Sequence, residues 1–282
     1  MRKTDIRLPA IFCLVFLCPF HGEGTEIVSL GEGYGLRLVR SEETTLQLIK
    51  EGGVVESIRA AAFYSMMPEA GEGHWSWPER QLPRDLNADG CPEFIVLAHS
   101  LGAHCCRTLY LFRLGNHPVL LDVLPLGNAR VDAMEDLNHD GEVDIISRDD
   151  LFAYWRAPYA LSPMPRVVFS IGREGFRVNR ALMERPPPSG EQWRRWLASV
   201  RSAPDWRDHS PSPPPRLWDI MASLIYQGHP RLADRFLEEA WVLQDKERSA
   251  FAEDFYDLFT TNSNFLNLND SGIIHDYNQQ KR

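Results

Sequence analysis

Two copies of one short acidic loop limit the folds open to this chain more than any other feature. The stretches "DLNADGCPEFIV" and "DLNHDGEVDIIS" begin at Asp85 and Asp136, and 51 residues separate the two starts. Gly90 and Gly141 stand at the same position of each copy, where glycine permits a tight backbone reversal. A run typical of a β-strand follows each loop. The repeat therefore predicts two strands that each begin at an acidic turn.

Oxygen-bearing side chains recur at positions 1, 3, 5 and 9 of both copies. This spacing lets them converge on Ca²⁺, with a backbone carbonyl at position 7. An EF-hand would need glutamate at position 12, where Val96 and Ser147 stand, and a helix would have to follow. A metal-free turn is the alternative, because Asp, Asn and Gly also favour turns. The predicted ligands, with Cys91 and Glu142 contributing carbonyls, are Asp85, Asn87, Asp89, Cys91, Glu93, Asp136, Asn138, Asp140, Glu142 and Asp144.

A D-x-N-x-D-G-x-x-[DE] loop that leads into a strand and is repeated resembles the FG-GAP/VCBS repeats. The resemblance covers about residues 80–150 and implies propeller blades with calcium bound between strands. The stretches "GAHCC" and "LWDIMASLIYQGHP" also resemble a family of uncharacterised exported bacterial proteins, which brings no known activity. Together they imply an exported calcium-binding protein with a structural or binding role and no enzymatic activity.

Periodicity divides the chain into a β-rich half and a helical end. We expect a mainly β N-terminal domain, with partial propeller-like or sandwich-like antiparallel sheets, and a small all-α C-terminal domain. Apolar residues recur at helical spacing after Pro215, Gly228 can end the first helix, and Pro230 can begin the next. The expected segments are a signal peptide (1–24), a β domain (25–182), a Pro-rich linker with a short helix (183–215), a helical domain (216–262) and a polar tail (263–282).

The N-terminus predicts export. Arg2 and Lys3 precede the apolar run from Leu8 to Phe20, a layout typical of a cleaved signal peptide, and later segments are too polar to span a bilayer. The mature chain is therefore expected in the periplasm or outside the cell, without a transmembrane span. A net charge of -9 disfavours nucleic acid as a partner, which leaves an unknown protein or glycan ligand.

The stretch "LAHSLGAHCC" offers an enzymatic alternative. "HSLG" after an apolar run is similar to the G-x-S-x-G elbow of serine hydrolases, with Ser100 as the nucleophile. Ala98 replaces the first glycine, and the segment from Arg107 to Leu114 is typical of a strand where the elbow needs a helix. The downstream sequence also lacks strand and helix alternation. A hairpin turn is therefore the favoured interpretation of this stretch.

Three cysteines remain after signal cleavage, an odd number for an oxidising compartment. With the hairpin turn at 100–103, Cys91 is too far along its strand to reach Cys105 or Cys106. The adjacent pair can form a vicinal disulfide, stay as two thiols, or bind a soft metal with His104 and with His99 as a further ligand. A thiol or soft-metal protein is therefore the third functional alternative.

Overall fold

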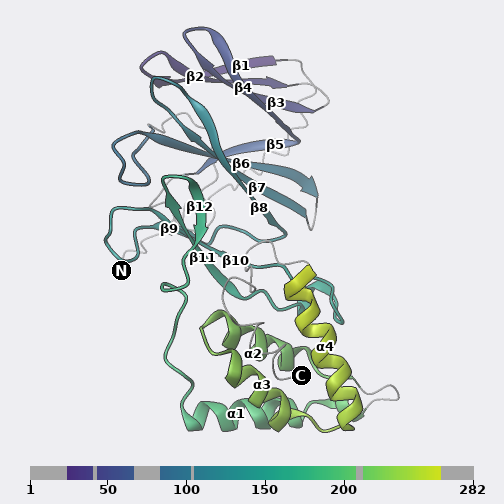
Figure 1. The fold of residues 1–282 in the computed structure, drawn as a ribbon. Helices are drawn as coiled ribbons and strands as arrows, with labels where there is room; N and C mark the ends of the chain where they lie inside the picture. Colours follow the sequence, from purple (N-terminus) through teal and green to yellow (C-terminus); the bar gives the residue numbers. More distant parts are fainter. Residues whose placement is uncertain (1–23, 41–42, 67–82, 103–104, 208–211, 262–282) are drawn as a thin grey trace, which may run out of the picture.

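The computed structural model describes residues 24–40, 43–66, 83–102, 105–207 and 212–261. The predicted signal peptide, apart from Gly24, and the predicted polar tail lie outside these residues. Three antiparallel sheets follow one another along the long dimension of the molecule, and the helices gather at one end (Figure 1). No helix in the described ranges is long and apolar enough to cross a membrane.

The first sheet is a four-stranded meander whose order follows the sequence. Its strands are β1 (Gly24–Gly31), β2 (Tyr34–Arg40), β3 (Thr44–Lys50) and β4 (Gly53–Ala60). Two-residue loops join β1 to β2 and β3 to β4, and in the second both Glu51 (φ 49°) and Gly52 (φ 83°) have positive φ. That backbone matches the right-handed twist of a hairpin. The pair Leu36 and Leu48 lies on the buried face.

The second sheet also follows the sequence and is covered on both faces. It contains β5 (Ala62–Met66), β6 (Glu93–Gly102), β7 (Cys105–Arg113) and β8 (Val119–Gly127). Because successive side chains of a strand point to opposite faces, Phe94 and Val96 of β6 pack against the first sheet. Ile95 and Leu97 join the larger core on the other side. This double burial explains why "EFIVLA" is almost continuously apolar.

The third sheet has the order β12-β11-β10-β9. Its strands are β9 (Ala133–Glu135), β10 (Asp144–Arg148), β11 (Arg166–Gly172) and β12 (Gly175–Val178). Each acidic loop ends at the first residue of a strand, because Glu93 begins β6 and Asp144 begins β10. The two loops thus hold equivalent positions in neighbouring sheets.

Local signals set the helix ends. The helices are α1 (Gly190–Arg201), α2 (Pro215–Tyr226), α3 (Pro230–Ala240) and α4 (Asp245–Thr261), with 3₁₀ turns at Tyr159–Leu161 and Pro204–Arg207. The Ser189 hydroxyl accepts a hydrogen bond from the Gln192 amide and caps α1. Proline occupies the first turn of α2 and of α3, where its missing N–H costs no helical hydrogen bond. Gly228 (φ 87°) makes the turn between them.

One apolar cluster joins the second sheet, the third sheet and all four helices. Phe152, in the segment after β10, stacks on Phe255 of α4 with 5.3 Å between ring centroids. Trp155 of the same segment meets Trp218 of α2 edge-on at 5.5 Å. The helices therefore have no core of their own, in contrast to the separate small all-α domain expected from the sequence. The first sheet packs instead in a second cluster with the outer face of β6 and β7.

A buried acid also ties α2 to the third sheet. Asp149 is 2% exposed and accepts hydrogen bonds from the Tyr226 hydroxyl (2.5 Å) and the Leu151 amide (2.9 Å). Burial raises the pKa of Asp149 to about 6, and it raises the pKa of Tyr226 well above its ordinary value. The carboxyl group is therefore protonated more readily in the folded chain than in the unfolded one.

This pKa predicts a loss of stability as the pH rises. The contribution of Asp149 is fully present below the pKa of the unfolded carboxyl, about 3.9, and is lost as the pH approaches the folded value. Between pH 4 and 7, we expect wild type to lose about 2–3 kcal/mol more unfolding free energy than Asp149→Asn. Urea unfolding across this range measures the difference. The exposed control Glu191→Gln should show the wild-type dependence of the unfolding free energy on pH. The same dependence in Asp149→Asn would contradict the prediction.

Candidate functional site

The two acidic loops have the same hydrogen-bonded structure. Asp85 accepts from the amides of Asp89 (3.1 Å) and Gly90 (2.9 Å). Asp136 accepts from the corresponding amides of Asp140 (3.2 Å) and Gly141 (3.0 Å). Ala88 and His139, at equivalent positions, both have positive φ (56° and 61°). The sequence repeat is therefore a repeat of one turn geometry.

The remaining loop oxygens accept backbone N–H groups in the same way. Asn87 and Asn138 accept from the amides of Asp89 and Asp140. Glu93 accepts from the Leu86 amide at 2.9 Å, and Asp144 accepts from the Leu137 amide at 3.0 Å. Burial is the main reason why the pKa of Glu93 is raised to about 7. The acidic side chains thus stabilise the turns by themselves.

The structure brings each predicted ligand set together within its own loop, but other groups also engage the acids. Arg113 pairs with Asp89, and the side chain of Glu142 pairs with Arg177. Cys91 is a free, partly buried cysteine whose amide donates to Asp89 at 2.9 Å. In the described ranges, no group of three His, Cys, Asp or Glu side chains has an arrangement that could hold a metal ion. Calcium binding by the loops stays a prediction.

Calcium removal tests that prediction directly. If the loops bind Ca²⁺, the melting temperature should fall on adding chelator, because a ligand at about 100 times its Kd stabilises the folded state by about 2.7 kcal/mol. Asp140→Ala should reduce the difference between the melting temperatures with calcium and with chelator. Asp245→Ala, at the start of α4, should retain that difference. Calorimetry with calcium and with chelator measures it. An unchanged wild-type melting temperature would exclude calcium as a structural ion.

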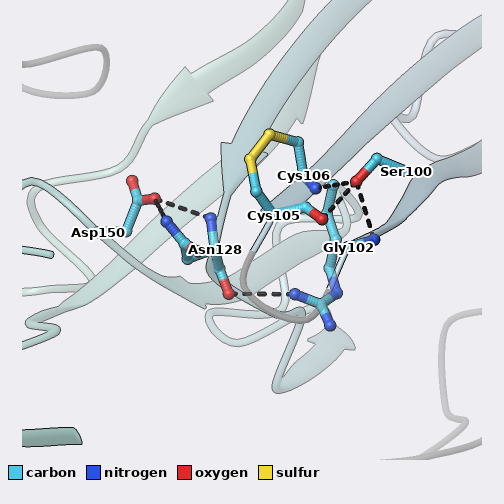
Figure 2. The surroundings of a disulfide bond; sticks show 7 residues. Ser100, Gly102, Cys105, Cys106, Asn128 and Asp150 are labelled. Atoms are coloured by element: carbon cyan, nitrogen blue, oxygen red, sulfur yellow. Dashed lines mark hydrogen bonds between the residues drawn. A yellow bond between two sulfur atoms is a disulfide. The ribbon is translucent and has the colours of Figure 1, made fainter. Parts of the chain in front are cut away.

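Ser100 lies near the end of β6, two residues before the last residue of that strand, and faces the start of β7 (Figure 2). Its hydroxyl accepts hydrogen bonds from the amides of Cys106 (2.5 Å) and Gly102 (3.3 Å) and donates to the Cys105 carbonyl. Leu101 has positive φ (61°). A side chain at Gly102 would lie 2.6 Å from the Cys105 carbonyl oxygen, so only glycine fits. Two backbone N–H groups therefore converge on one exposed serine hydroxyl.

A disulfide joins Cys105 and Cys106 beside Ser100 (Figure 2). In this state the two sulfur atoms are not available as thiolate ligands for a soft metal. His104, the predicted partner for such a metal, lies outside the described residues.

The Asn128 backbone and side-chain N–H groups both donate to Asp150, at 2.7 and 2.8 Å. The Asn128 carbonyl in turn accepts from Arg107 of β7 at 3.1 Å, which fixes the strand that follows the disulfide.

A cavity of about 540 Å³ adjoins Ser100. His99 and Ser100 both line it, at the end of β6 where the pairing with β7 becomes irregular. The buried Nε2 of His99 has no hydrogen-bond partner within the described structure. Burial, and then the nearby charge of Arg107, lower the pKa of His99, which favours the neutral form of the imidazole.

Sequence reasoning assigned His99 only to a soft-metal site and missed its place beside Ser100. The signal available was adjacency in "AHSLG", but neighbouring residues of a regular strand face opposite ways. In the structure, Ala98, His99 and Ser100 all line one cavity at the end of β6. Of the other lining residues, Glu43 and Arg59 come from the first sheet and its adjoining turn, while Tyr110 comes from β7. The cavity is thus assembled from segments that are distant in the sequence.

Comparison with known proteins identifies a family for most of the chain. A model of the alpha/beta hydrolase family matches residues 15–257. The chain is also 33% identical over 78 residues to the uncharacterized protein y4bJ of Sinorhizobium fredii. That match covers 27% of this chain and 12% of the relative, so the chain spans only a small part of the relative's length. No solved structure matches.

The family match overturns several expectations from the sequence. The FG-GAP/VCBS assignment is wrong, and so are the expected non-enzymatic role and the calcium-binding repeat function built on it. The physical reason is that the motif describes a turn: its Asp and Asn side chains bind the amides of their own loop, a chemistry that many folds use. A turn motif covering part of the chain therefore cannot identify the family of the whole chain.

The expected fold class is also wrong, because the match runs through both the β-rich half and the helices as one hydrolase domain. The continuous apolar cluster across both parts agrees with this correction. Two local features still differ from the usual nucleophile elbow. β7 follows Ser100 where a helix would be expected, and every strand pair in the described ranges is antiparallel. The family assignment rests on the sequence match, whereas the site's geometry comes from the turn itself.

Proposed function

We propose that this chain, which belongs to the alpha/beta hydrolase family, is a hydrolase that uses Ser100 as its nucleophile. One observation carries the assignment of the residue: Ser100 borders a cavity that is also lined by His99, whose Nε2 has no hydrogen-bond partner among the described residues. The cavity volume of about 540 Å³ falls in the range typical of small-molecule sites. An ester of a small carboxylic acid is the substrate class that fits this chemistry.

His99 is the proposed general base. A base must be unprotonated to accept the serine proton, and the lowered pKa of His99 favours the neutral imidazole. Its Nε2 has no hydrogen-bond partner among the described residues and can therefore accept a proton without breaking an existing contact. To react, the Ser100 hydroxyl must release the Cys105 carbonyl and donate to His99 instead.

The reaction then follows the usual course of acyl transfer. Ser100 Oγ forms a bond to the ester carbonyl carbon while its proton passes to His99. The leaving alcohol takes that proton as the ester C–O bond breaks, and water subsequently hydrolyses the acyl-enzyme. The amides of Gly102 and Cys106, which bind Oγ in the resting turn, become free to bind the developing oxyanion.

Covalent labelling tests the proposal. An active serine should react with a fluorophosphonate probe, and mass spectrometry of the digested protein should locate the adduct on Ser100. Heat-denatured protein is the control for chemical labelling of exposed hydroxyls. Labelling of another serine, or equal labelling of native and denatured protein, would reject Ser100 as the nucleophile.

The cell compartment and partners belong to the same proposal. The N-terminal charge and apolar pattern support export to the periplasm or cell exterior. The net charge of -9 supports a partner other than nucleic acid, and an unknown protein or glycan ligand stays the predicted partner. Fractionation of cells that express the full chain, with detection of a form shortened by about the length of a signal peptide, checks the compartment.

A further inference from the structure

A small cavity at the junction of the third sheet and α2 gathers three arginines. Its volume is about 240 Å³, and its lining residues come from β10, β11, α2 and the segments beside them. Figure 1 shows β10 and β11 as the strands next to the helices. Arg148 ends β10, Arg166 begins β11, and Arg185 lies in the segment before α1. Ser223 and Gln227, from the end of α2, line the same cavity. Three separate segments thus deliver positive charge to one place.

The arrangement of these arginines is electrostatically unfavourable by itself. Arg148 and Arg166 are direct cross-strand partners in the β10–β11 pair, where like charges destabilise a sheet. Arg166 and Arg185 both donate to the Leu182 carbonyl, each at 3.4 Å, so their guanidinium groups share one acceptor. The cluster also runs against the composition of the chain, whose net charge is -9. A favourable interaction with an anion would offset this repulsion.

The protein itself supplies little compensating charge. Arg148 pairs with Asp132 at 3.0 Å, and the one carboxylate among the described residues that line the cavity, Asp219 of α2, pairs with Arg216 at 2.5 Å. Across the described ranges, no carboxylate lies within ion-pair distance of Arg166 or Arg185. Burial and the charges of Arg185 and Arg148 together lower the pKa of Arg166, although the carboxylates of Asp132 and Glu135 oppose that shift. The cavity therefore keeps an excess of positive charge.

We propose that this cavity binds the phosphate group of a small phosphate monoester. A phosphate dianion can accept from several guanidinium forks at once, and arginine suits this geometry. The Ser223 hydroxyl and the Gln227 amide add neutral donors on the opposite wall. Met164 and Met183 provide an apolar wall for the organic part of the ligand. The Tyr226 hydroxyl takes no part, because it donates to Asp149.

The proposal does not depend on hydrolase activity. The Ser100 turn belongs to the second sheet, whereas the arginine cavity belongs to the third sheet and α2. The two cavities share no lining residue. Loss of either function can therefore be measured without affecting the assignment of the other.

Titration of the full chain with inorganic phosphate tests the site, using calorimetry at constant ionic strength. Wild type should bind phosphate saturably and show a raised melting temperature. Arg166→Gln and Arg185→Gln should weaken binding by about tenfold or more, since each removes a charged hydrogen-bond donor. Arg195→Gln, on the exposed face of α1, is the matched control and should bind as wild type does.

Stability without phosphate separates a binding role from a structural one. Because Arg166 faces a like charge, Arg166→Gln should melt at the same or a higher temperature than wild type when phosphate is absent. A lower melting temperature for that variant would show that Arg166 holds the fold, and it would overturn the proposal. Absence of saturable binding, equal loss in Arg195→Gln, or equally tight binding of acetate would overturn it as well.

Discussion

Replacing Ser100 with alanine should lower the kcat/KM for a small ester by about 10⁴-fold or more, or about 5 kcal/mol of transition-state stabilisation. Alanine removes the atom that would bond to the carbonyl carbon. The loss should appear mainly in kcat, because the cavity walls that hold the substrate stay in place. Steady-state kinetics with short-chain nitrophenyl esters measure the change.

A matched variant keeps this result specific. Ser199 lies on α1, far from the cavity in the sequence, and its hydroxyl donates only to the Trp196 carbonyl. Ser199→Ala should therefore retain wild-type kinetics. His99→Gln should lose activity while its melting temperature stays near that of wild type, because Nε2 has no partner within the described structure. Full activity in Ser100→Ala would refute the nucleophile assignment.

Replacing Phe152 with alanine should lower the free energy of unfolding by about 3–5 kcal/mol. Phe152 has no exposed surface and contacts the rings of Trp155, Phe255 and Phe259. It lies in the segment after β10, whereas Phe255 and Phe259 lie on α4, so the cavity would open at the joint between the sheets and the helices. Denaturant unfolding, followed by tryptophan fluorescence and by circular dichroism, measures the loss.

Tyr154 is the matched control for this core. It is an aromatic residue in the same segment, but it is 56% exposed. Tyr154→Ala should change stability by no more than about 1 kcal/mol. Both probes should give one shared transition in Phe152→Ala, because sheets and helices share a core. Separate transitions for the sheets and the helices would instead mean that the helical part is an independent unit.

Local features of this protein follow from short stretches of sequence. The turns at Asp85 and Asp136 are closed by hydrogen bonds between residues four and five positions apart, so composition and spacing are sufficient to predict them. The turn at Gly228 after α2 and the start of α3 at Pro230 follow from local signals in the same way. The error lay in extending the loop motif to a family, since a motif that stabilises its own turn says little about the rest of the chain.

The site residues were harder to predict because they depend on long-range packing. Ser100 was named from its motif, but its cavity also needs Glu43 and Arg59, which come from a distant part of the sequence. The stretch departs from the elbow pattern at Ala98 and in the strand-like segment from Arg107 to Leu114, and these departures favoured the hairpin interpretation. The family match, spread over residues 15–257, depends on many weak similarities that no single motif contains.

The sequence by itself determined the turns, the helix ends and the adjacency of His99 and Ser100, because these depend on interactions between near neighbours. Only the tertiary structure decided that both residues share a cavity, that Asp149 lies buried under Tyr226, and that Arg148, Arg166 and Arg185 meet beside α2. Those contacts depend on strand register and on the burial of a common core. Such properties arise when distant segments pack together, and they leave no pattern in any one segment.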